Sequence, residues 1–413
     1  MLTQRRFDVL IVGMGPAGIA AACAAAASGF DVGIVDDNPR EGGQIWRGGA
    51  PSKLAADWIA RFRAARIERL SETRVVDAPE AGVLRAECVD GPVDLRYSKL
   101  ILATGARERF LPFPGWTLPG VVGAGGLQAL VKGGVPIEGK RVVVAGSGPL
   151  LLAVAAYLRK HGATVALIAE QTGWARLARF GLSLAREPAK VLQGIELKWA
   201  LRGVPYVTGC WPVQALGEDR LAAVVLKTSG KTWREPCDYL ACGFGLVPNL
   251  ELPALLGCAI RNGFVAVDEW LQTSLPGIYC AGEPNGIGGV DLALMEGRIA
   301  GFAAAGLQDQ ARREFAGRAR SLWIRTGLDQ AFALRDELRA MTTPDTIVCR
   351  CEDVPLERMR AHPAWRTAKL QTRCGMGPCQ GRICGPAAEF LLGWKQESVR
   401  PPIFPVPVDH LSR

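Results

Sequence analysis

The chain has 413 residues, of which 49% are hydrophobic and 22% charged, a composition typical of a globular protein of roughly two or three domains. Its formal net charge is +9, but no run of like charge and no interleaved aromatic pattern indicates nucleic-acid binding. No apolar run is long enough to span a membrane, and glycines that follow the first apolar stretch argue against a secretion signal. We therefore expect a cytoplasmic protein.

A nucleotide-binding pattern begins near the N-terminus. Residues 7–12 predict a buried strand, residues 19–27 lie in an alanine-rich helix, and residues 31–35 predict a second strand. Between and after these elements lie the residues that we expect to contact the nucleotide: Gly13, Gly15, Pro16, Ala17, Gly18, Asp36 and Asp37. This strand–turn–helix–strand order is the context that a G-x-G-x-x-G pattern requires.

Each part of this pattern has a physical role. Gly13 forms the tight turn, Gly15 lets a pyrophosphate approach the backbone, and Gly18 allows the helix to pack closely on the strand. The phosphates then lie at the helix N-terminus, where free N–H groups and the helix dipole favour negative charge. The carboxylate of Asp36 is placed to accept hydrogen bonds from ribose hydroxyls.

Three later segments indicate that this nucleotide is FAD. Residues 41–44 follow the acidic pair, residues 100–105 form a strand that ends in a small-residue turn, and residues 273–283 repeat that design before a helix that starts near residue 288. With these segments, residues 5 to 305 resemble the two-dinucleotide-binding flavoproteins, which include the glutathione- and thioredoxin-reductase-like enzymes. The resemblance implies further FAD contacts at Gly43, Gln44, Thr104, Gly105, Gly282, Glu283 and Gly289. Glu283 stands where that family usually has aspartate.

A second strand–turn–helix–strand unit follows. Residues 140–145 predict a strand, Gly146 and Gly148 form the turn, and a further strand ends at Glu170, which favours an unphosphorylated ribose. Leu151 replaces the third small residue of the pattern. Three interpretations remain open: a working NAD(H) site, a structurally bound adenine nucleotide, or an empty domain kept for packing. No cysteine pair follows Gly43, so we expect no disulfide reductase activity.

Four C-terminal cysteines form two close pairs, Cys349 with Cys351 and Cys379 with Cys384. A [2Fe–2S] cluster needs four thiolates divided between two irons, whereas the one-residue and four-residue gaps fit the usual spacing of structural zinc poorly. The segment resembles the bacterioferritin-associated-ferredoxin-like [2Fe–2S] module, which implies these four residues as ligands. We interpret a fifth cysteine, Cys374, as a bystander.

Nearly the whole chain resembles the FAD- and cluster-bearing subunit of heteromeric amine dehydrogenases, such as opine oxidase, hydrogen cyanide synthase, and proline or D-hydroxyproline dehydrogenase. Segments 35–40, 123–130, 145–152 and 242–249 carry this likeness. The resemblance implies an α/β two-dinucleotide-binding fold with a small C-terminal [2Fe–2S] domain. It also implies that a partner subunit with its own FAD oxidises the amine or amino acid, and that this chain passes the electrons to an acceptor. No residue of this chain is then assigned to substrate catalysis.

The same resemblance allows an FMN at the partner interface, a further small subunit, and membrane association made through partners. It implies a discontinuous FAD-binding domain (1–112 and 262–310), an NAD(P)-type domain (113–261), and a C-terminal region (311–413) with a helical linker, the [2Fe–2S] domain and a Pro-rich tail. Two other hypotheses stay open: a self-sufficient NADH-dependent reductase, and a non-catalytic assembly subunit whose nucleotide and zinc are structural.

Overall fold

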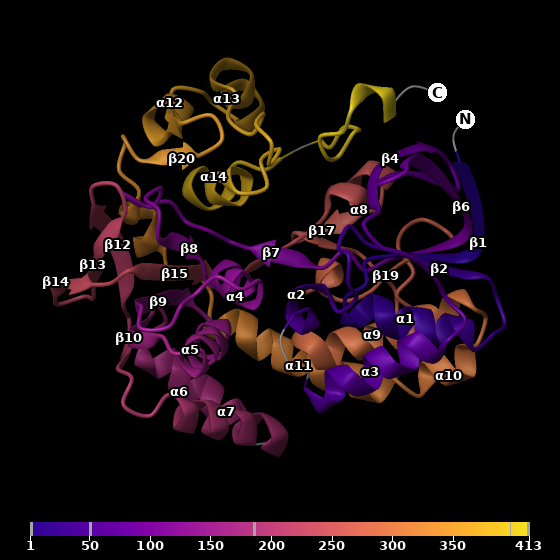
Figure 1. Cartoon of the computed structure of the whole chain (residues 1–413), viewed down its shortest axis with the longest axis horizontal. Coiled ribbons are helices and arrows are strands. Elements are labelled where there is room, and N and C mark those ends of the chain that lie inside the picture. Colours follow the sequence, from indigo (N-terminus) through magenta and orange to yellow (C-terminus); the bar gives the residue numbers. More distant parts are fainter. Residues whose placement is uncertain (1–2, 49–51, 185–186, 397, 411–413) are drawn as a thin grey trace. The chain divides into compact units, whose positions relative to one another are not determined.

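The computed structural model describes residues 3–48, 52–184, 187–396 and 398–410, and its contacts divide the chain into two compact units. Unit 1 comprises Met1–Arg107, Pro248–Arg325 and Glu397–Arg413, and unit 2 comprises Glu108–Val247 and Thr326–Gln396. The chain passes between the units in the short strands β7 (Ala106–Glu108) and β16 (Leu246–Pro248) and along helix α11 (Phe315–Ala331) (Figure 1).

Unit 1 contains a seven-stranded sheet. Its strands are, in order, β3 (Glu68–Leu70), β2 (Val32–Val35), β1 (Thr3–Val12), β6 (Gly91–Leu102), β5 (Val83–Cys88) and β4 (Arg74–Glu80), with β19 (Ile278–Cys280) also paired to β6. The pairs among β3, β2, β1, β6 and β19 are parallel. Their carboxyl ends therefore meet at one edge of the sheet, which is where ligands bind in such folds.

Unit 1 also contains helices and two short strands. They are α1 (Pro16–Ala26), α2 (Gly43–Trp46), α3 (Lys53–Ala64), α8 (Glu251–Leu256), α9 (Gly289–Ala304) and α10 (Gln308–Arg312), with β17 (Ile260–Arg261) and β18 (Phe264–Val265). The strand, helix and strand that the sequence predicts at the first glycine pattern are β1, α1 and β2. The Pro-rich tail also packs on unit 1, since Ile403 is buried and its N–H donates to the Val76 carbonyl at 2.8 Å.

Helices α1 and α9 pack against each other at very short range. A Cβ atom added at Gly297 would lie 2.2 Å from the Ala17 carbonyl oxygen, and one at Gly301 would lie 2.3 Å from the Ala21 oxygen. Only glycine fits at these two positions of α9, because the α1 backbone occupies the space that a side chain would need. This contact fixes α1, and therefore its N-terminus, relative to the rest of unit 1.

Unit 2 is built on a second parallel sheet. Its strands are, in order, β11 (Tyr206–Thr208), β10 (Thr164–Glu170), β9 (Arg141–Ser147), β15 (Tyr239–Phe244) and β8 (Val121–Gly123). An antiparallel meander follows as β12 (Trp211–Gly217), β13 (Leu221–Lys227) and β14 (Thr232–Pro236). The helices of this part are α4 (Ala124–Lys132), α5 (Leu150–Lys160), α6 (Trp174–Ser183) and α7 (Pro188–Ala200).

The C-terminal part of unit 2 is a small module with its own core. Its elements are β20 (Ile347–Cys349), β21 (Val354–Pro355), α12 (Leu356–Arg360), α13 (Trp365–Thr372) and α14 (Cys384–Leu392). The module is joined to the loop before β8, because Trp116 Nε1 donates to the Ile347 carbonyl at 2.6 Å and Arg350 donates to the Thr117 carbonyl at 3.2 Å.

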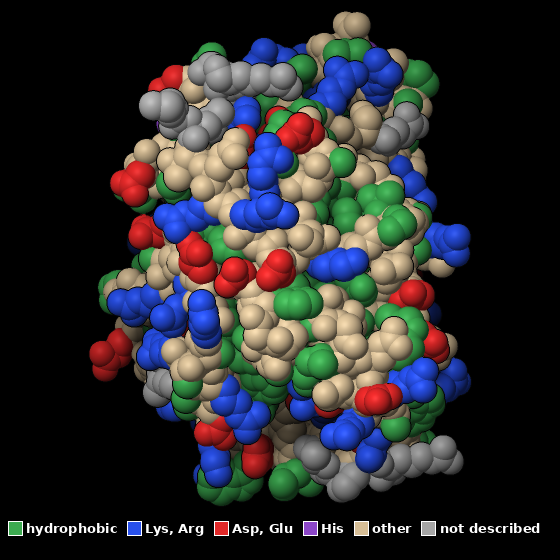
Figure 2. All heavy atoms as spheres, turned by 90° about the vertical axis from the view of Figure 1, so that its right-hand side faces the viewer, with side chains coloured by type: hydrophobic (Ala, Val, Ile, Leu, Met, Phe, Trp, Pro, Cys, Tyr) green, Lys and Arg blue, Asp and Glu red, His purple; other side chains and the backbone are tan. Residues whose placement is uncertain are grey.

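Charges of both signs are mixed on the face drawn in Figure 2, where Lys and Arg side chains lie between Asp and Glu side chains and scattered hydrophobic ones. A continuous basic surface of the kind that binds nucleic acid is therefore not present on that face. Among the residues that the structure describes, no helix is both long enough and apolar enough to cross a membrane.

The contact between α1 and α9 predicts a large effect of one substitution. Gly297→Leu should lower the melting temperature of the protein by about 5 °C or more, because the new side chain must displace the α1 backbone. Gly194→Leu is the matched control, since Gly194 is a helical glycine of α7 with no atom within 4 Å of an added Cβ. Equal melting temperatures for the two variants in differential scanning fluorimetry would contradict the packing described.

Candidate cofactor sites

The first glycine turn leaves space for a ligand at one position only. Gly13 has a φ of 109°, and a Cβ there would lie 2.3 Å from the Ala103 carbonyl oxygen. A Cβ at Gly18 would lie 1.8 Å from the Gly13 oxygen. At Gly15, in contrast, an added Cβ meets nothing within 4 Å, so the open volume lies over Gly15.

The N-terminus of α1 faces this volume, and no side chain in the described part of the chain caps it. Gly15 is the N-cap residue and has no side chain to accept a hydrogen bond, and the first turn contains no acidic residue. The donors and the positive end of the helix dipole are therefore available to an anion, and pyrophosphate has the charge and the oxygen atoms that they need. Pro16 and Ala17 form the first turn of this helix.

Asp36 and Asp37 have different surroundings. Asp36 Oδ2 accepts a hydrogen bond from the Met14 N–H at 2.6 Å, and its Oδ1 accepts one from the Asn38 N–H at 2.9 Å. The Asn38 side chain donates both to Asp36 Oδ1 at 2.6 Å and to Asp37 Oδ1 at 2.9 Å, and Asp37 also forms an ion pair with Arg74. Asp36 is thus held beside the glycine turn, at the end of β2, where a ribose would lie.

The later segments reach the same turn. Gly43, with a φ of 57°, lies so close that an added Cβ would be 2.9 Å from the Gly15 Cα, and the Gly42 N–H donates to the Met14 carbonyl at 2.8 Å. A Cβ at Gly282 would lie 2.9 Å from the Ala17 Cβ. The exposed Gln44 side chain contacts Arg47 rather than the turn.

Thr104 and Gly105 are held by a residue that the sequence did not single out. Thr104 Oγ1 donates to the Asn249 carbonyl at 2.9 Å, and Asn249 Nδ2 donates to the Thr104 carbonyl at 2.8 Å. Arg107 Nη1 donates to Asn249 Oδ1 at 2.7 Å. The only sequence signal for this role was the Asn that ends segment 242–249.

Glu283 accepts a hydrogen bond from the Ala106 N–H, and burial raises the pKa of its carboxyl group. A second buried acid, Glu296 of α9, accepts from the Gly282 N–H at 2.9 Å and from Arg318 Nε at 3.2 Å. The 282–283 turn is therefore fixed from both sides, and α9 begins beyond it at Gly289. Sequence reasoning missed Glu296, which has no recognisable motif.

The second glycine turn is differently arranged. Glu170 is fully buried, and its two oxygens accept from the Gly148 N–H and the Thr172 N–H, each at 2.8 Å. Ser147, between Gly146 and Gly148, donates its hydroxyl proton to the Phe332 carbonyl at 3.1 Å. Both oxygens of Glu170 accept backbone hydrogen bonds, as the oxygens of Asp36 do at the first turn, but Glu170 is fully buried, whereas Asp36 is only partly buried.

The segment that follows α11 is bonded to this second turn. Gln171, also fully buried, donates from Nε2 to Ser147 Oγ at 2.9 Å and to the Ala333 carbonyl at 3.3 Å. Arg335 donates to the Gln171 carbonyl at 3.4 Å, and its guanidinium lies 4.7 Å from the Trp211 ring centroid. Residues 332–335 are therefore attached to the place where the sequence predicts a ribose contact.

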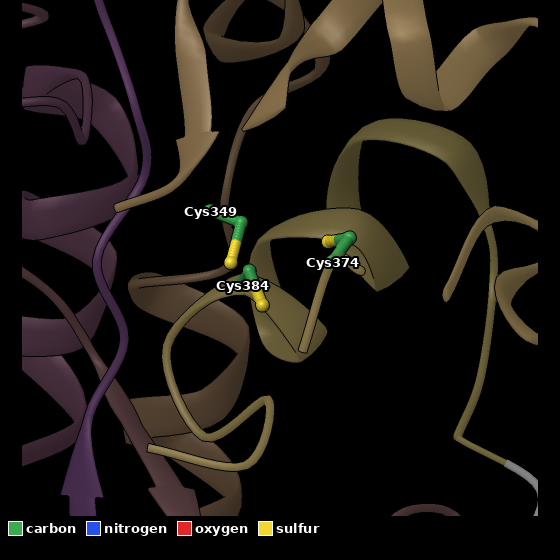
Figure 3. A group of neighbouring side chains, drawn as sticks. All are labelled: Cys349, Cys374 and Cys384. Carbon is green, nitrogen blue, oxygen red and sulfur yellow. The ribbon is translucent and has the colours of Figure 1, made fainter. Parts of the chain in front are cut away.

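Three cysteine sulfurs converge in the C-terminal module. Cys349 ends β20, Cys374 follows α13 and Cys384 begins α14, and their Sγ atoms all lie within 4.8 Å of one another (Figure 3). All three side chains are buried. Cys351 and Cys379 form a second close pair nearer the surface, within hydrogen-bonding reach of each other.

The arrangement stabilises negative charge on the sulfur of Cys349, and its hydrogen bonds with the Cys374 and Cys384 thiols raise the pKa values of those two groups. The Gly375 N–H donates to Cys349 Sγ at 3.5 Å, and Gly377 has no room for a side chain because a Cβ would lie 2.4 Å from the Cys351 Cβ. Hydrogen bonds from the Cys374 and Cys384 thiols lower the pKa of Cys349 well below its usual range. Thiolates are the form of cysteine that binds metal, so the three sulfurs are compatible with a metal or iron–sulfur site.

Comparison with known proteins agrees with this geometry. Residues 7–297 match the model of the pyridine nucleotide-disulphide oxidoreductases. The chain belongs to this family, and it is an oxidoreductase with the two-domain α/β fold of FAD-binding flavoproteins. The family implies FAD, and the open volume over Gly15, the uncapped N-terminus of α1 and the position of Asp36 fit that cofactor.

Similar proteins share nearly the whole chain. It is 33% identical to hydrogen cyanide synthase subunit HcnB of Pseudomonas aeruginosa, covering 96% of this chain and 97% of that protein. It is 31% identical to one of the subunits of opine oxidase from Rhizobium meliloti, covering 98% of this chain and 87% of that protein. The fold matches L-proline dehydrogenase from P. horikoshii with a TM-score of 0.69 at 20% identity, over 100% of this chain and 81% of that one.

The free space at Gly15 predicts a variant that folds but does not bind FAD. Gly15→Val should leave the melting profile of the flavin-free protein nearly unchanged, because its φ of −79° suits any residue and its Cβ meets no atom. The same side chain blocks the pyrophosphate, so the purified variant should lack flavin absorbance. Gly230→Val, in an exposed loop with equally free space, is the control and should keep its flavin. Full FAD content in Gly15→Val would place the pyrophosphate elsewhere.

Proposed function

We propose that this chain is the electron-transfer subunit of a heteromeric FAD-dependent dehydrogenase that oxidises a secondary amine, imino acid or opine. The substrate, for example proline or D-hydroxyproline, is oxidised in a partner subunit, and this chain relays the electrons through FAD and a [2Fe–2S] cluster to an acceptor. The observation that carries the proposal is the presence, in one chain, of an FAD fold and a separate module in which buried cysteine sulfurs converge.

The arrangement of the cysteines supports a cluster with two irons. Cys349 lies next to Cys384, and Cys351 lies next to Cys379, so each cysteine loop supplies one sulfur to each pair. Two thiolates per iron are what a [2Fe–2S] cluster requires. Cys374 lies beside Cys349 and Cys384 and is therefore an alternative ligand. The four ligands that we propose are Cys349, Cys351, Cys379 and Cys384. These residues belong to a proposed [2Fe–2S] domain within region 311–413.

The names of the relatives support the proposal that substrate oxidation and electron transfer take place in different subunits. The two curated relatives are subunits of hydrogen cyanide synthase and of opine oxidase, and the similar fold is that of an L-proline dehydrogenase. We therefore place substrate oxidation in a catalytic FAD-containing partner, and the complex is completed by an FMN at the interface and by a further small subunit. When bound, FAD supplies the chemistry of accepting an electron pair and releasing single electrons to a one-electron carrier.

The second glycine turn supports a donor other than NADH. Glu170 is fully buried with both oxygens occupied, and the carbonyls of Phe332 and Ala333 accept hydrogen bonds from Ser147 and Gln171. Since the side chain of Glu170 has no exposed surface, a ribose could reach it only after this packing is displaced. Of the three interpretations of this domain, we therefore favour the one in which it is kept for packing and binds no NAD(H).

The ligand assignment predicts different results for two single substitutions. Cys379→Ser should remove the visible iron–sulfur absorbance while FAD stays bound, because the two cofactors occupy separate parts of the chain. Cys374→Ser is the matched control and should keep its iron. Iron analysis and visible spectra of the anaerobically purified variants measure both effects. Loss of iron from Cys374→Ser together with retention in Cys379→Ser would show that Cys374 is a ligand in place of Cys379.

The proposal also predicts the response to a reductant. NADH added anaerobically to the purified chain should not bleach the flavin within minutes, whereas dithionite should. Rapid bleaching by NADH would instead favour a self-sufficient NADH-dependent reductase. Zinc in place of iron, with a flavin that dithionite does not reduce, would favour the hypothesis of a non-catalytic assembly protein.

A further inference from the structure

Arg109, which follows strand β7, is partly buried and carries a charge that the fold does not pair. Its Nε atom is buried and donates no hydrogen bond, and among the described residues its guanidinium group forms no ion pair and stacks on no aromatic ring. Arginine stays charged inside a protein, and a charge that is removed from water without a partner destabilises the fold. The structure therefore leaves one positive charge uncompensated at this point.

The two acids nearest to this charge do not neutralise it. The carboxylate of Glu108, the preceding residue, accepts from the Gly125 and Gly126 N–H groups at 2.7 and 3.0 Å and so satisfies the first turn of α4. Glu389 of α14 is exposed and, within the described part of the chain, forms no ion pair with Arg109. Burial lowers the pKa of Arg109, and the charge of Glu389 opposes that shift without cancelling it.

Arg109 lies where ligands bind in folds of this kind. Its N–H donates to the Gly245 carbonyl at 2.9 Å, and its carbonyl accepts from the Phe244 N–H at 3.1 Å. Phe244 is the last residue of β15, a strand of the parallel sheet of unit 2, so Arg109 lies at the carboxyl edge of that sheet. Gly245 has a φ of 90°, and an added Cβ there meets nothing within 4 Å. Space is therefore open beside the backbone that pairs with Arg109.

The chemistry of the guanidinium group selects the ligand. It donates two parallel N–H bonds, one of them from Nε, to the two oxygens of a carboxylate or a phosphate. Such an anion gives the buried Nε an acceptor and neutralises the charge at the same time. A neutral ligand supplies only the acceptor, and a cation is repelled.

We propose that Arg109 anchors a site at the carboxyl end of β15 for an oxyanion, the phosphate or carboxylate group of a small ligand. The guanidinium group binds two oxygens of the anion, and the space beside Gly245 accommodates the rest of the ligand. The site is separate from the second glycine turn, which lies at the end of the neighbouring strand β9. It stands independently of the proposed function.

Melting temperatures measured in the presence of two anions test this proposal. Sodium phosphate and sodium acetate are each titrated against sodium chloride at constant ionic strength, on the FAD-loaded protein with any subunits that co-purify. Loaded protein is needed because the free N-terminus of α1 would itself bind anions. The melting temperature of the wild type should rise with one of the two anions, since a ligand that binds only the folded state stabilises it. A response to phosphate identifies a phosphorylated ligand, and a response to acetate identifies a carboxylate.

Arg109→Met separates a ligand site from a structural arginine. Without anion its melting temperature should lie about 2 °C or more above that of the wild type, because an unpaired buried charge has been removed. With anion it should not rise further. Arg220→Met, at an exposed arginine in the turn between β12 and β13, is the matched control and should change neither result. Glu389→Gln removes a competing negative charge, and the anion should bind it about two- to fivefold more tightly.

Three results would overturn the proposal. The first is a wild type that responds to neither anion, or whose response disappears when co-purifying subunits are present, because an acid of the partner then pairs with Arg109. The second is an Arg109→Met variant that responds as the wild type does, which would place the anion elsewhere. The third is an Arg109→Met variant that is less stable than the wild type without anion, or that does not fold, because the side chain is then bonded within the fold.

Discussion

Close backbone packing around the first glycine turn is the constraint on which the FAD site depends. A Cβ atom added at Gly13 would meet the Ala103 carbonyl, one at Gly18 would meet the Gly13 carbonyl, and one at Gly297 would meet the α1 backbone. None of these positions accepts even a methyl group. As a result the N-terminus of α1 is fixed at the carboxyl edge of the parallel strands, and Gly15 is the one glycine of the G-x-G-x-x-G turn over which space is left. The cofactor site exists because packing elsewhere in the turn is complete.

The two proposed cofactors are held by different chemistry. At the FAD site the protein offers neutral donors, because Gly15 caps α1 without a side chain. At the C-terminal module it offers the proposed sulfur ligands and supports negative charge on Cys349 with the backbone N–H of Gly375. Each site suits one kind of anion. The second glycine turn differs from both, because its acid, Glu170, is fully buried.

Sequence alone was sufficient wherever local geometry determines the residue type. The glycines at 13, 15 and 18 and the acid that ends the next strand are such cases, since a tight turn permits few alternatives. The four-cysteine ligand set stays a prediction. Contacts between distant segments could not be predicted in this way. Asn249 holds the turn at Thr104, and Glu296 fixes the turn at Gly282. Neither residue belongs to a sequence motif from which its role could be predicted. The closure of the second turn by residues 332–335 depends on a helix far along the chain, and the position of Cys374 depends on how α13 ends.

The central claim is that one polypeptide holds both a flavin and an iron–sulfur cluster. Electron paramagnetic resonance during an anaerobic dithionite titration, with flavin and iron determined on the same sample, tests it most directly. The account predicts FAD and about two iron atoms per chain, with a cluster signal that appears on reduction while the flavin absorbance falls. A reduced sample without a cluster signal and without iron, prepared anaerobically throughout, would contradict it.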